Sequence, residues 1–151
     1  MAKIDPYEDI LQFAIYKEVE AYYFFKALAD KVATVEMRQI FEDLAKEELE
    51  HKARLELEIM KTGKAVSEEL PPVVADREYI LSDNEVPLDM DYKDILLLCI
   101  AKEEASFRTY VDLIAHARDV KTRDLLLELA EEEVKHKLRF ETEYTALFKK
   151  A

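Results

Sequence analysis

Apolar residues recur every three or four positions in four long segments of the chain, which is the spacing of one face of an α-helix. The segments span about 6–32, 35–62, 90–117 and 120–148. Asp5 and Pro6 are typical of an N-cap and a first helical position, and Gly63 is typical of a helix end. The pattern therefore predicts an all-α protein with four long helices.

Residues 63–89 separate the second segment from the third and contain three of the four prolines, with no helical period. The connections inside each pair of helices are short, so we expect each pair to form an antiparallel hairpin. The crossover of 63–89 is long enough to run the length of a helix, and we expect the third helix to begin at the same end as the first. The prediction is an antiparallel four-helix bundle of two hairpins, in a single domain covering 1–151.

The second half of the chain repeats the first at an offset of 85 residues, without a gap. Within this repeat, each half places one Glu and one later Glu-x-x-His pair on the expected core faces of its helices. The matched pairs are Glu18 and Glu103, Glu48 and Glu133, and His51 and His136. Chance could produce a Glu-x-x-His pattern in a Glu-rich chain, but its recurrence in phase is harder to explain in that way.

Four carboxylates on core faces would destabilise a fold, because a buried charge without a partner costs several kcal/mol. No Lys or Arg on those faces is obviously placed to neutralise them. Two divalent cations would neutralise all four, and the i, i+3 spacing lets Glu and His of one helix reach the same ion. Carboxylate and imidazole ligands suit iron or manganese, and zinc less well. The sequence therefore predicts a dinuclear metal site with positions open to oxygen or peroxide.

Four further residues lie close to these positions. Glu47 and Glu132 also repeat, and each either accepts the free ring N–H of a His across the bundle or lies on a solvated helix flank. Tyr22 and Tyr110 lie one and two turns after a predicted ligand, and either is a candidate catalytic residue that supplies a proton or an electron. The alternative is that both rings only fill the core.

Composition narrows the classes of partner. A net charge of −12 argues against binding to nucleic acid. The N-terminus is too polar for a signal peptide and no apolar run has membrane-spanning length, so we expect a cytoplasmic protein without membrane contact. The single Cys99 cannot form an internal disulfide and is expected to fill the core. In the run Tyr22 to Phe25, we expect Tyr23 and Phe24 to point away from the core and to be covered either by the crossover or by a second subunit, and we favour a homodimer.

These motifs resemble the ferritin-like di-iron carboxylate superfamily, and most of all rubrerythrin-type domains. The matching parts are Glu18-x-x-Ala21, Glu47-Glu48-x-x-His51, Glu103-x-x-Ser106 and Glu132-Glu133-x-x-His136. The resemblance implies a ferritin-like bundle that holds two iron ions, although manganese or zinc could be the metal loaded. It also implies that Glu48 and Glu133 bridge or chelate the ions, with Glu18 and Glu103 as outer carboxylates.

The resemblance implies an oxidoreductase that reduces hydrogen peroxide or dioxygen and protects against oxidative stress. Rubrerythrins carry a rubredoxin-like domain with four cysteines, which this sequence does not contain, so we expect electrons from a separate donor protein such as a rubredoxin. Rubrerythrins commonly place an extra Glu where this chain has Ser106, which leaves peroxide reduction open to alternatives. These are a ferroxidase that handles ferrous ion and a non-catalytic metal-binding bundle.

Overall fold

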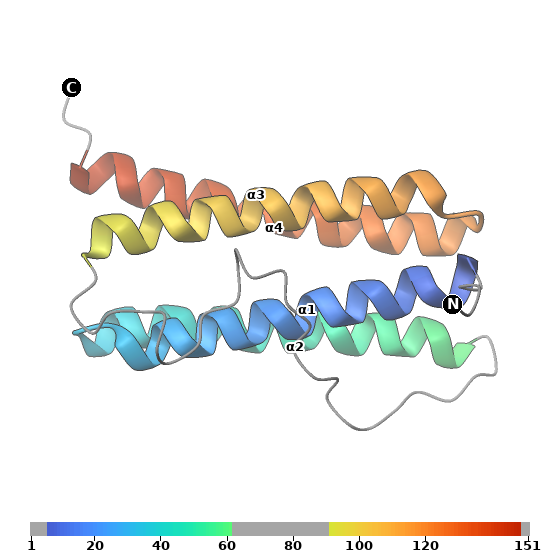
Figure 1. Ribbon diagram of the computed structural model, residues 1–151, viewed down its shortest axis with the longest axis horizontal. Coiled ribbons are helices and arrows are strands. Elements are labelled where there is room, and N and C mark those ends of the chain that lie inside the picture. The colour runs from blue at the N-terminus through green and yellow to red at the C-terminus, as the bar shows by residue number, and fades with distance from the viewer. Residues whose placement is uncertain (1–5, 62–90, 149–151) are drawn as a thin grey trace, which may run out of the picture.

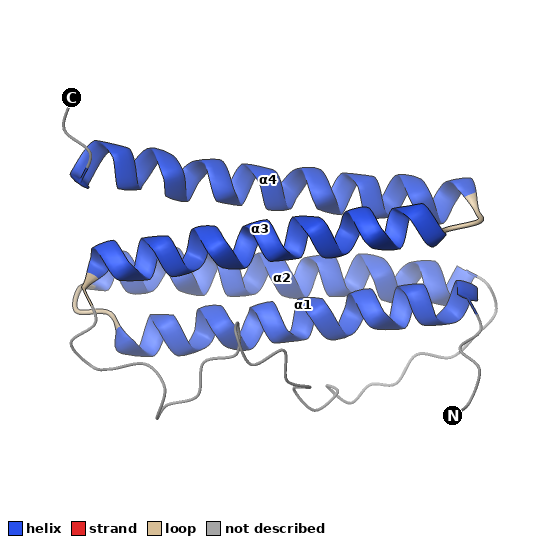
Figure 2. Cartoon of the chain, turned by 45° about the horizontal axis from the view of Figure 1, so that its top comes forward, coloured by secondary structure: helices blue, strands red, loops and turns tan. Residues whose placement is uncertain are grey.

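The chain folds into four helices in a computed structural model that describes residues 6–61 and 91–148 (Figure 1). The helices are α1 (Pro6–Lys31), α2 (Val35–Lys61), α3 (Tyr92–His116) and α4 (Val120–Phe148). Each bound falls within two residues of the span expected from the apolar pattern, and the described residues outside the helices form short connections (Figure 2). The expected crossover of 63–89 lies outside the described residues.

The helices form an antiparallel bundle of two hairpins, α1 with α2 and α3 with α4. α1 also lies beside α3, and α2 beside α4. In Figure 1, α1 and α4 run from right to left, whereas α2 and α3 run from left to right. Every neighbouring pair is therefore antiparallel.

The expectation that the third helix begins at the same end as the first is wrong. α2 ends beside the start of α1, and α3 begins at the opposite end of the bundle (Figure 1). A connection that runs the length of the bundle from the end of α2 must therefore arrive where α1 finishes. This arrangement makes α3 antiparallel to its neighbour α1.

Matching caps begin the second helix of each hairpin. The side chain of Thr34 accepts a hydrogen bond from the backbone N–H of Met37 at 3.2 Å. Asp119, the matching residue of the second half, accepts from the N–H of Thr122 at 3.2 Å. Each cap satisfies an N–H group that has no partner inside the helix, which fixes where α2 and α4 start.

Two apolar clusters fill the bundle, one toward each end. The first includes three stacked rings, Phe25, Phe41 and Phe140, whose centroids lie 6.3 to 6.4 Å apart. The second includes Leu11 and Leu126, both fully buried. On α2, α3 and α4 the predicted Glu and His positions fall between the segments that supply the two clusters, and on α1 Glu18 lies at the inner edge of the second cluster, beside Val19. The fold therefore holds a polar layer between two dry ones.

No helix among the described residues is long and apolar enough to cross a membrane.

Phe24, which was expected to point away from the core, is fully buried within one chain and packs edge-on against Phe25 at 5.2 Å between centroids. The reason is that Phe24 belongs to the same apolar cluster as Phe25. Tyr23 is half-buried against the other cluster. The homodimer stays a prediction, no longer supported by Phe24.

Candidate metal centre

The six predicted ligands come together at the middle of the bundle, from all four helices. α1 supplies Glu18, α3 supplies Glu103, α2 supplies Glu48 and His51, and α4 supplies Glu133 and His136. All six are buried, with exposed fractions between 1% and 6%. The i, i+3 spacing on α2 and α4 places each Glu and His pair on the same inward face, as the sequence pattern requires.

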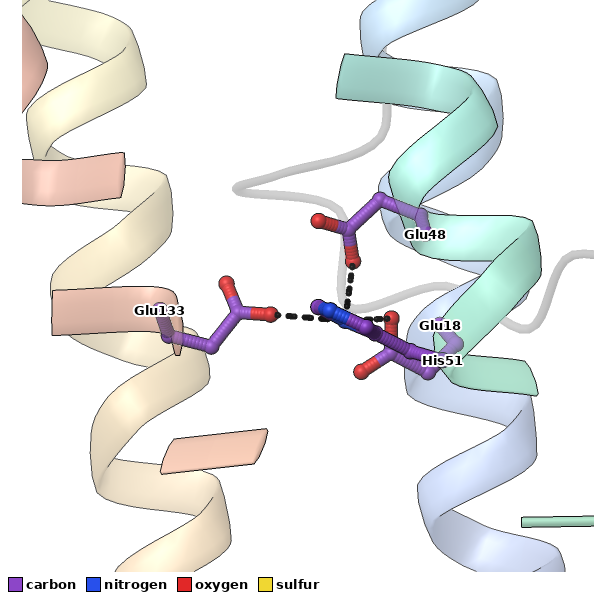
Figure 3. Close-up of side chains that lie close together, drawn as sticks. All are labelled: Glu18, Glu48, His51 and Glu133. Carbon is purple, nitrogen blue, oxygen red and sulfur yellow. Dashed lines mark hydrogen bonds and ion pairs between the residues drawn. The ribbon is translucent and has the colours of Figure 1, made fainter. Parts of the chain in front are cut away.

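The residues form two overlapping groups that share Glu48 and Glu133. In the first group, which also contains Glu18 and His51, one ligand atom from each residue lies within 4.8 Å of the others (Figure 3). The Nδ1 atom of His51 lies 3.3 Å from Oε2 of Glu18, 3.6 Å from Oε1 of Glu133 and 3.8 Å from Oε2 of Glu48.

The second group adds Glu103 and His136 to the shared carboxylates. Here Nδ1 of His136 lies 3.6 Å from Oε1 of Glu48, 3.7 Å from Oε2 of Glu103 and 3.9 Å from Oε2 of Glu133. The rings of His51 and His136 are nearly parallel, with an interplanar angle of 12° and centroids 6.2 Å apart. Each half of the chain thus contributes one His, and the two histidines lie at opposite ends of a single cluster.

Several inward-facing atoms of this cluster have no hydrogen-bond partner. They are both carboxylate oxygens of Glu48 and of Glu133, Oε2 of Glu103 and Nδ1 of His136. A buried polar atom without a partner costs about 1–3 kcal/mol, and more if charged. Cations placed between these atoms would satisfy them, so the buried cluster is able to bind metal. Its oxygen and imidazole donors suit iron and manganese.

Without metal, the cluster retains protons. Burial, followed by the charges of Glu133 and Glu18, raises the pKa of Glu48 well above its usual range. Burial and the charge of Glu133 raise the pKa of Glu103 in the same way. Burial would also raise the pKa of Glu133, but its close approach to Glu103 and to His51 outweighs burial and lowers that pKa to about 2.

His51 keeps a proton for the same reason. Burial would lower the pKa of His51, but the nearby carboxylates of Glu133 and Glu18 raise it to about 10. The metal-free cluster therefore contains an imidazolium and protonated carboxyl groups, which partly cancel the negative charge. Divalent cations would have to displace these protons, because metals bind carboxylate and neutral imidazole.

The outer nitrogen of each His faces a carboxylate from the opposite hairpin. Nε2 of His51 on α2 lies 2.8 Å from Oε2 of Glu132 on α4. Nε2 of His136 on α4 lies 2.9 Å from Oε2 of Glu47 on α2, although that oxygen has no well-directed hydrogen bond. Of the two alternatives for Glu47 and Glu132, this geometry is the one expected of residues that orient the imidazoles.

The two candidate tyrosines differ in position. Tyr110 is buried and its hydroxyl donates a hydrogen bond to Oε1 of Glu18. Burial and the charge of Glu18 raise the pKa of Tyr110 well above its usual range, so the phenol keeps its proton. Tyr22 is half-buried against the first apolar cluster, and no hydrogen bond joins it to the site within the described residues. Only Tyr110 therefore contacts a predicted ligand.

The structure places a buried cation beside the site, and the sequence pattern did not reveal it. Lys102 is only 3% exposed, and its Nζ donates a hydrogen bond to Oγ of Ser106 at 3.2 Å. Its charge lowers the pKa of Glu103, although burial and Glu133 raise it by more. Lys102 is thus a cation near the carboxylates that does not belong to the core faces considered in the sequence. The repeat matches Lys102 to Lys17, which was the available signal.

A second unexpected cation is Arg54, on α2. One guanidinium nitrogen lies 3.1 Å from Oε2 of Glu132, the oxygen that also faces His51, and another pairs with Glu128. Arg54 thus connects the His51 contact with a surface ion pair.

Cys99 is fully buried in the first apolar cluster, as expected of a core residue.

A four-helix bundle with a buried Glu and His cluster drawn from all four helices defines the ferritin-like di-iron carboxylate class. The family model for rubrerythrin matches residues 9–144, so the chain belongs to the rubrerythrin family. None of the curated protein sequences is significantly similar to it. The resemblance stated from the motifs is confirmed.

Solved structures with the same fold belong to proteins of different functions. A manganese catalase of Anabaena is 19% identical, with a TM-score of 0.70 over 97% of this chain and 75% of that one. A bacterioferritin of Desulfovibrio desulfuricans with a diiron site is 17% identical, with a TM-score of 0.69 over 91% and 77%. A protein of Pyrococcus furiosus is 26% identical, with a TM-score of 0.65 over 91% and 87%. Such relatives establish the fold and leave the reaction open.

Proposed function

We propose that the chain holds two iron ions and reduces hydrogen peroxide or dioxygen with electrons from a separate donor protein such as a rubredoxin. The observation that carries the proposal is the pair of overlapping groups, in which Glu48 and Glu133 are shared and their buried oxygens lack partners. A structural ion needs neither a second position nor an open coordination site. Two adjacent positions suit a reaction that takes up two electrons at once.

The residues divide between the two positions. Glu18 and His51 would hold one ion, and Glu103 and His136 the other, with Glu48 and Glu133 reaching both. When bound, an iron pair supplies the two electrons that convert one peroxide, with two protons, into two waters. The apolar clusters on both sides exclude bulk water from the layer, which strengthens its electrostatic interactions.

Tyr110 supports redox chemistry at one of the two positions. Its hydroxyl proton is held at Oε1 of Glu18, which places a proton donor beside the reacting centre. Phe25 occupies the matching place in the other half and has no proton to give. Tyr110 is therefore our candidate for delivering a proton, and Tyr22, which is further from the ligands, is the weaker candidate.

A ferroxidase that oxidises ferrous ion at the same site is the second candidate. The observation that favours it is Ser106, whose hydroxyl is hydrogen-bonded by Lys102 where other rubrerythrins commonly carry a further Glu. Six protein ligands then remain, arranged alike in both halves. We rank this function second because the buried phenol of Tyr110 on Glu18 is better explained by proton delivery to an oxidant.

A paired substitution tests the site, and a mixing experiment tests the reaction. We expect Glu48→Gln with Glu133→Gln to lower bound iron from two per chain toward none, measured by elemental analysis after anaerobic loading. The control changes Glu50 and Glu131, exposed residues of the same two helices, to Gln and should keep both ions. Two irons per chain in the first variant would mean that the assigned ligands are wrong.

The reaction is tested by mixing the reduced protein with peroxide in the presence of excess ferrous ion. Peroxide reduction predicts rapid reoxidation of the bound ions and turnover that depends on an added reduced rubredoxin. Catalytic loss of the free ferrous ion, with ferric product accumulating, would instead establish the ferroxidase. If metal binds but reacts with neither peroxide nor ferrous ion, the protein is the non-catalytic metal-binding bundle.

A further inference from the structure

A small cavity lies beside His136, on the side of the bundle where α2 and α4 meet the start of α3. Its volume is about 80 Å³. Among the described residues its lining includes Ile40, Leu44, Tyr92, His136, Arg139 and Phe140. Since about 10–15 Å³ of such space is enough for one water molecule, the cavity has room for a molecule of the size of hydrogen peroxide.

The walls and the ends of this cavity differ in character. Ile40, Leu44 and Phe140 form apolar walls, and the imidazole of His136 lies at the inner end. Arg139 and Glu143 are exposed and therefore mark the outer end. A hydrated cation would find few oxygen ligands along such walls, whereas a small neutral molecule loses little on entering.

At the place beside His51 that the internal repeat matches to this cavity, an ion pair crosses between the hairpins. Arg54 there corresponds to Arg139, and it bridges Glu132 and Glu128 across the two hairpins. Glu58 corresponds to Glu143 and is only 8% exposed. The outer nitrogen of His51 is thus covered by an ionic bridge.

One shortened side chain accounts for the difference. The residue that matches Glu128 is Asp43, which is shorter by one methylene and accepts a hydrogen bond from Gln39 at 2.7 Å. In the part of the chain that the structure describes, Arg139 makes no ion pair with Asp43 or with Glu47. No bridge therefore crosses the outer end of the cavity over His136.

We propose that this cavity is the route by which a small neutral oxidant, such as hydrogen peroxide or dioxygen, reaches the ion position at His136. The proposal rests on the proposed function and adds the side of the bundle from which the oxidant enters. It assigns Ile40 and Leu44 as residues that set the width of the route. The oxidant would thus enter at the ion position held by Glu103, away from Tyr110 and Glu18.

Matched substitutions at the two related positions test the route. Ile40→Trp narrows the cavity, and Leu125→Trp makes the same change at the repeat position, where Leu125 is also half-buried. The probe is nitric oxide, a neutral molecule of dioxygen's size that binds ferrous iron, with its association rate followed by stopped-flow absorbance. We expect Ile40→Trp to slow binding by about tenfold or more, equivalent to about 1.4 kcal/mol on the barrier, and Leu125→Trp to leave it unchanged.

Both variants must still hold two irons per chain, and nitric oxide binding needs neither a donor nor turnover. The route can therefore hold even if the protein proves not to reduce peroxide. Equal slowing in both variants, or slowing only in Leu125→Trp, would overturn the route.

A widening variant covers the case in which Ile40→Trp does not fold. Ile40→Ala should accelerate reoxidation by the bulkier tert-butyl hydroperoxide relative to hydrogen peroxide, whereas Leu125→Ala should not change this ratio. An unchanged ratio in Ile40→Ala would also overturn the proposal.

Discussion

The retained protons of the metal-free cluster predict how its stability and metal affinity depend on pH. The folded chain keeps protons on Glu48 and Glu103, whose pKa values are raised well above 4.5, and on His51, whose pKa is raised from 6.5 to about 10. The unfolded chain has released all three above pH 6.5. A group with a raised pKa stabilises the fold at low pH and loses that contribution as the pH rises through its folded value.

The magnitude follows from the number of protons. Each proton held only by the folded state lowers the free energy of unfolding by about 1.4 kcal/mol per pH unit. The proton on His51 gives a slope of about 1.4 kcal/mol per pH unit between pH 6.5 and about 10. The protons on Glu48 and Glu103 add to this slope above pH 4.5, until the pH passes the raised pKa of each group. Glu133 acts in the opposite sense, because its lowered pKa of about 2 adds stability above pH 4.5 that is lost on acidification.

Metal binding should remove this dependence of the free energy of unfolding on pH. Bound cations displace the three protons, so the metal-loaded fold has no such slope and its affinity for metal rises with pH. We therefore expect the metal-free protein to lose stability between about pH 7 and pH 9, while the gap to the loaded protein widens. Denaturant unfolding of both forms measures the slopes, and calorimetric titration with ferrous or cobalt ion in two buffers counts the released protons.

Substitution of one carboxyl group isolates the contribution of that group to the pH dependence of the free energy of unfolding. Glu48→Gln carries a neutral amide in both states, so the metal-free variant should lose about 1.4 kcal/mol per pH unit of the slope. Glu50→Gln makes the same charge change at an exposed position of α2 and should leave the slope as it is. A metal-free protein whose stability stays level or rises over this range, or metal binding without proton release, would refute the reasoning.

Three further outcomes follow from the contacts. Tyr110→Phe should keep both irons but slow reoxidation by peroxide, with little change in Tyr22→Phe; stopped-flow reoxidation of the two variants decides whether the phenol on Glu18 matters. Glu132→Ala leaves Nε2 of His51 without its partner and should weaken metal binding by about 10- to 100-fold, as measured by competition with a chelator. Leu55→Ala empties a fully buried position in the second apolar cluster and should cost about 2–5 kcal/mol of unfolding free energy, measured in denaturant.

The helices and the gathering of the six candidate ligands in one layer could be predicted from the sequence because both depend on strict spacing. Glu48 and His51 sit three residues apart on an apolar face, so burial of that face must bring them into the core together. The repeat then places Glu133 and His136 in the same layer from the other hairpin. Nothing in these arguments requires knowledge of side-chain contacts between helices.

The direction of α3 and the environment of Lys102 could not be obtained in the same way. The direction depends on where the chain lies after Lys61, and spacing within a helix carries no information on that. Lys102 lies on α3 directly before Glu103, where the helical period predicts a flank, yet it is only 3% exposed. Phe24 was misjudged in the same way, because the helical period does not show what packs against a flank.

The differences between the two halves carry the chemistry that the shared ligands leave undecided. Tyr110 stands where the first half has Phe25, and within the described residues Glu18 is the candidate ligand that accepts a hydrogen bond from a tyrosine hydroxyl. Asp43 stands where the second half has Glu128, so only the His51 side is closed by an arginine bridge. If these differences are functional, proton delivery and oxidant entry take place at opposite ends of the ion pair. A variant that exchanges the residues at these positions between the two halves, Phe25 with Tyr110 and Asp43 with Glu128, would then change the reaction. Because no ligand is removed, the metal would stay in place.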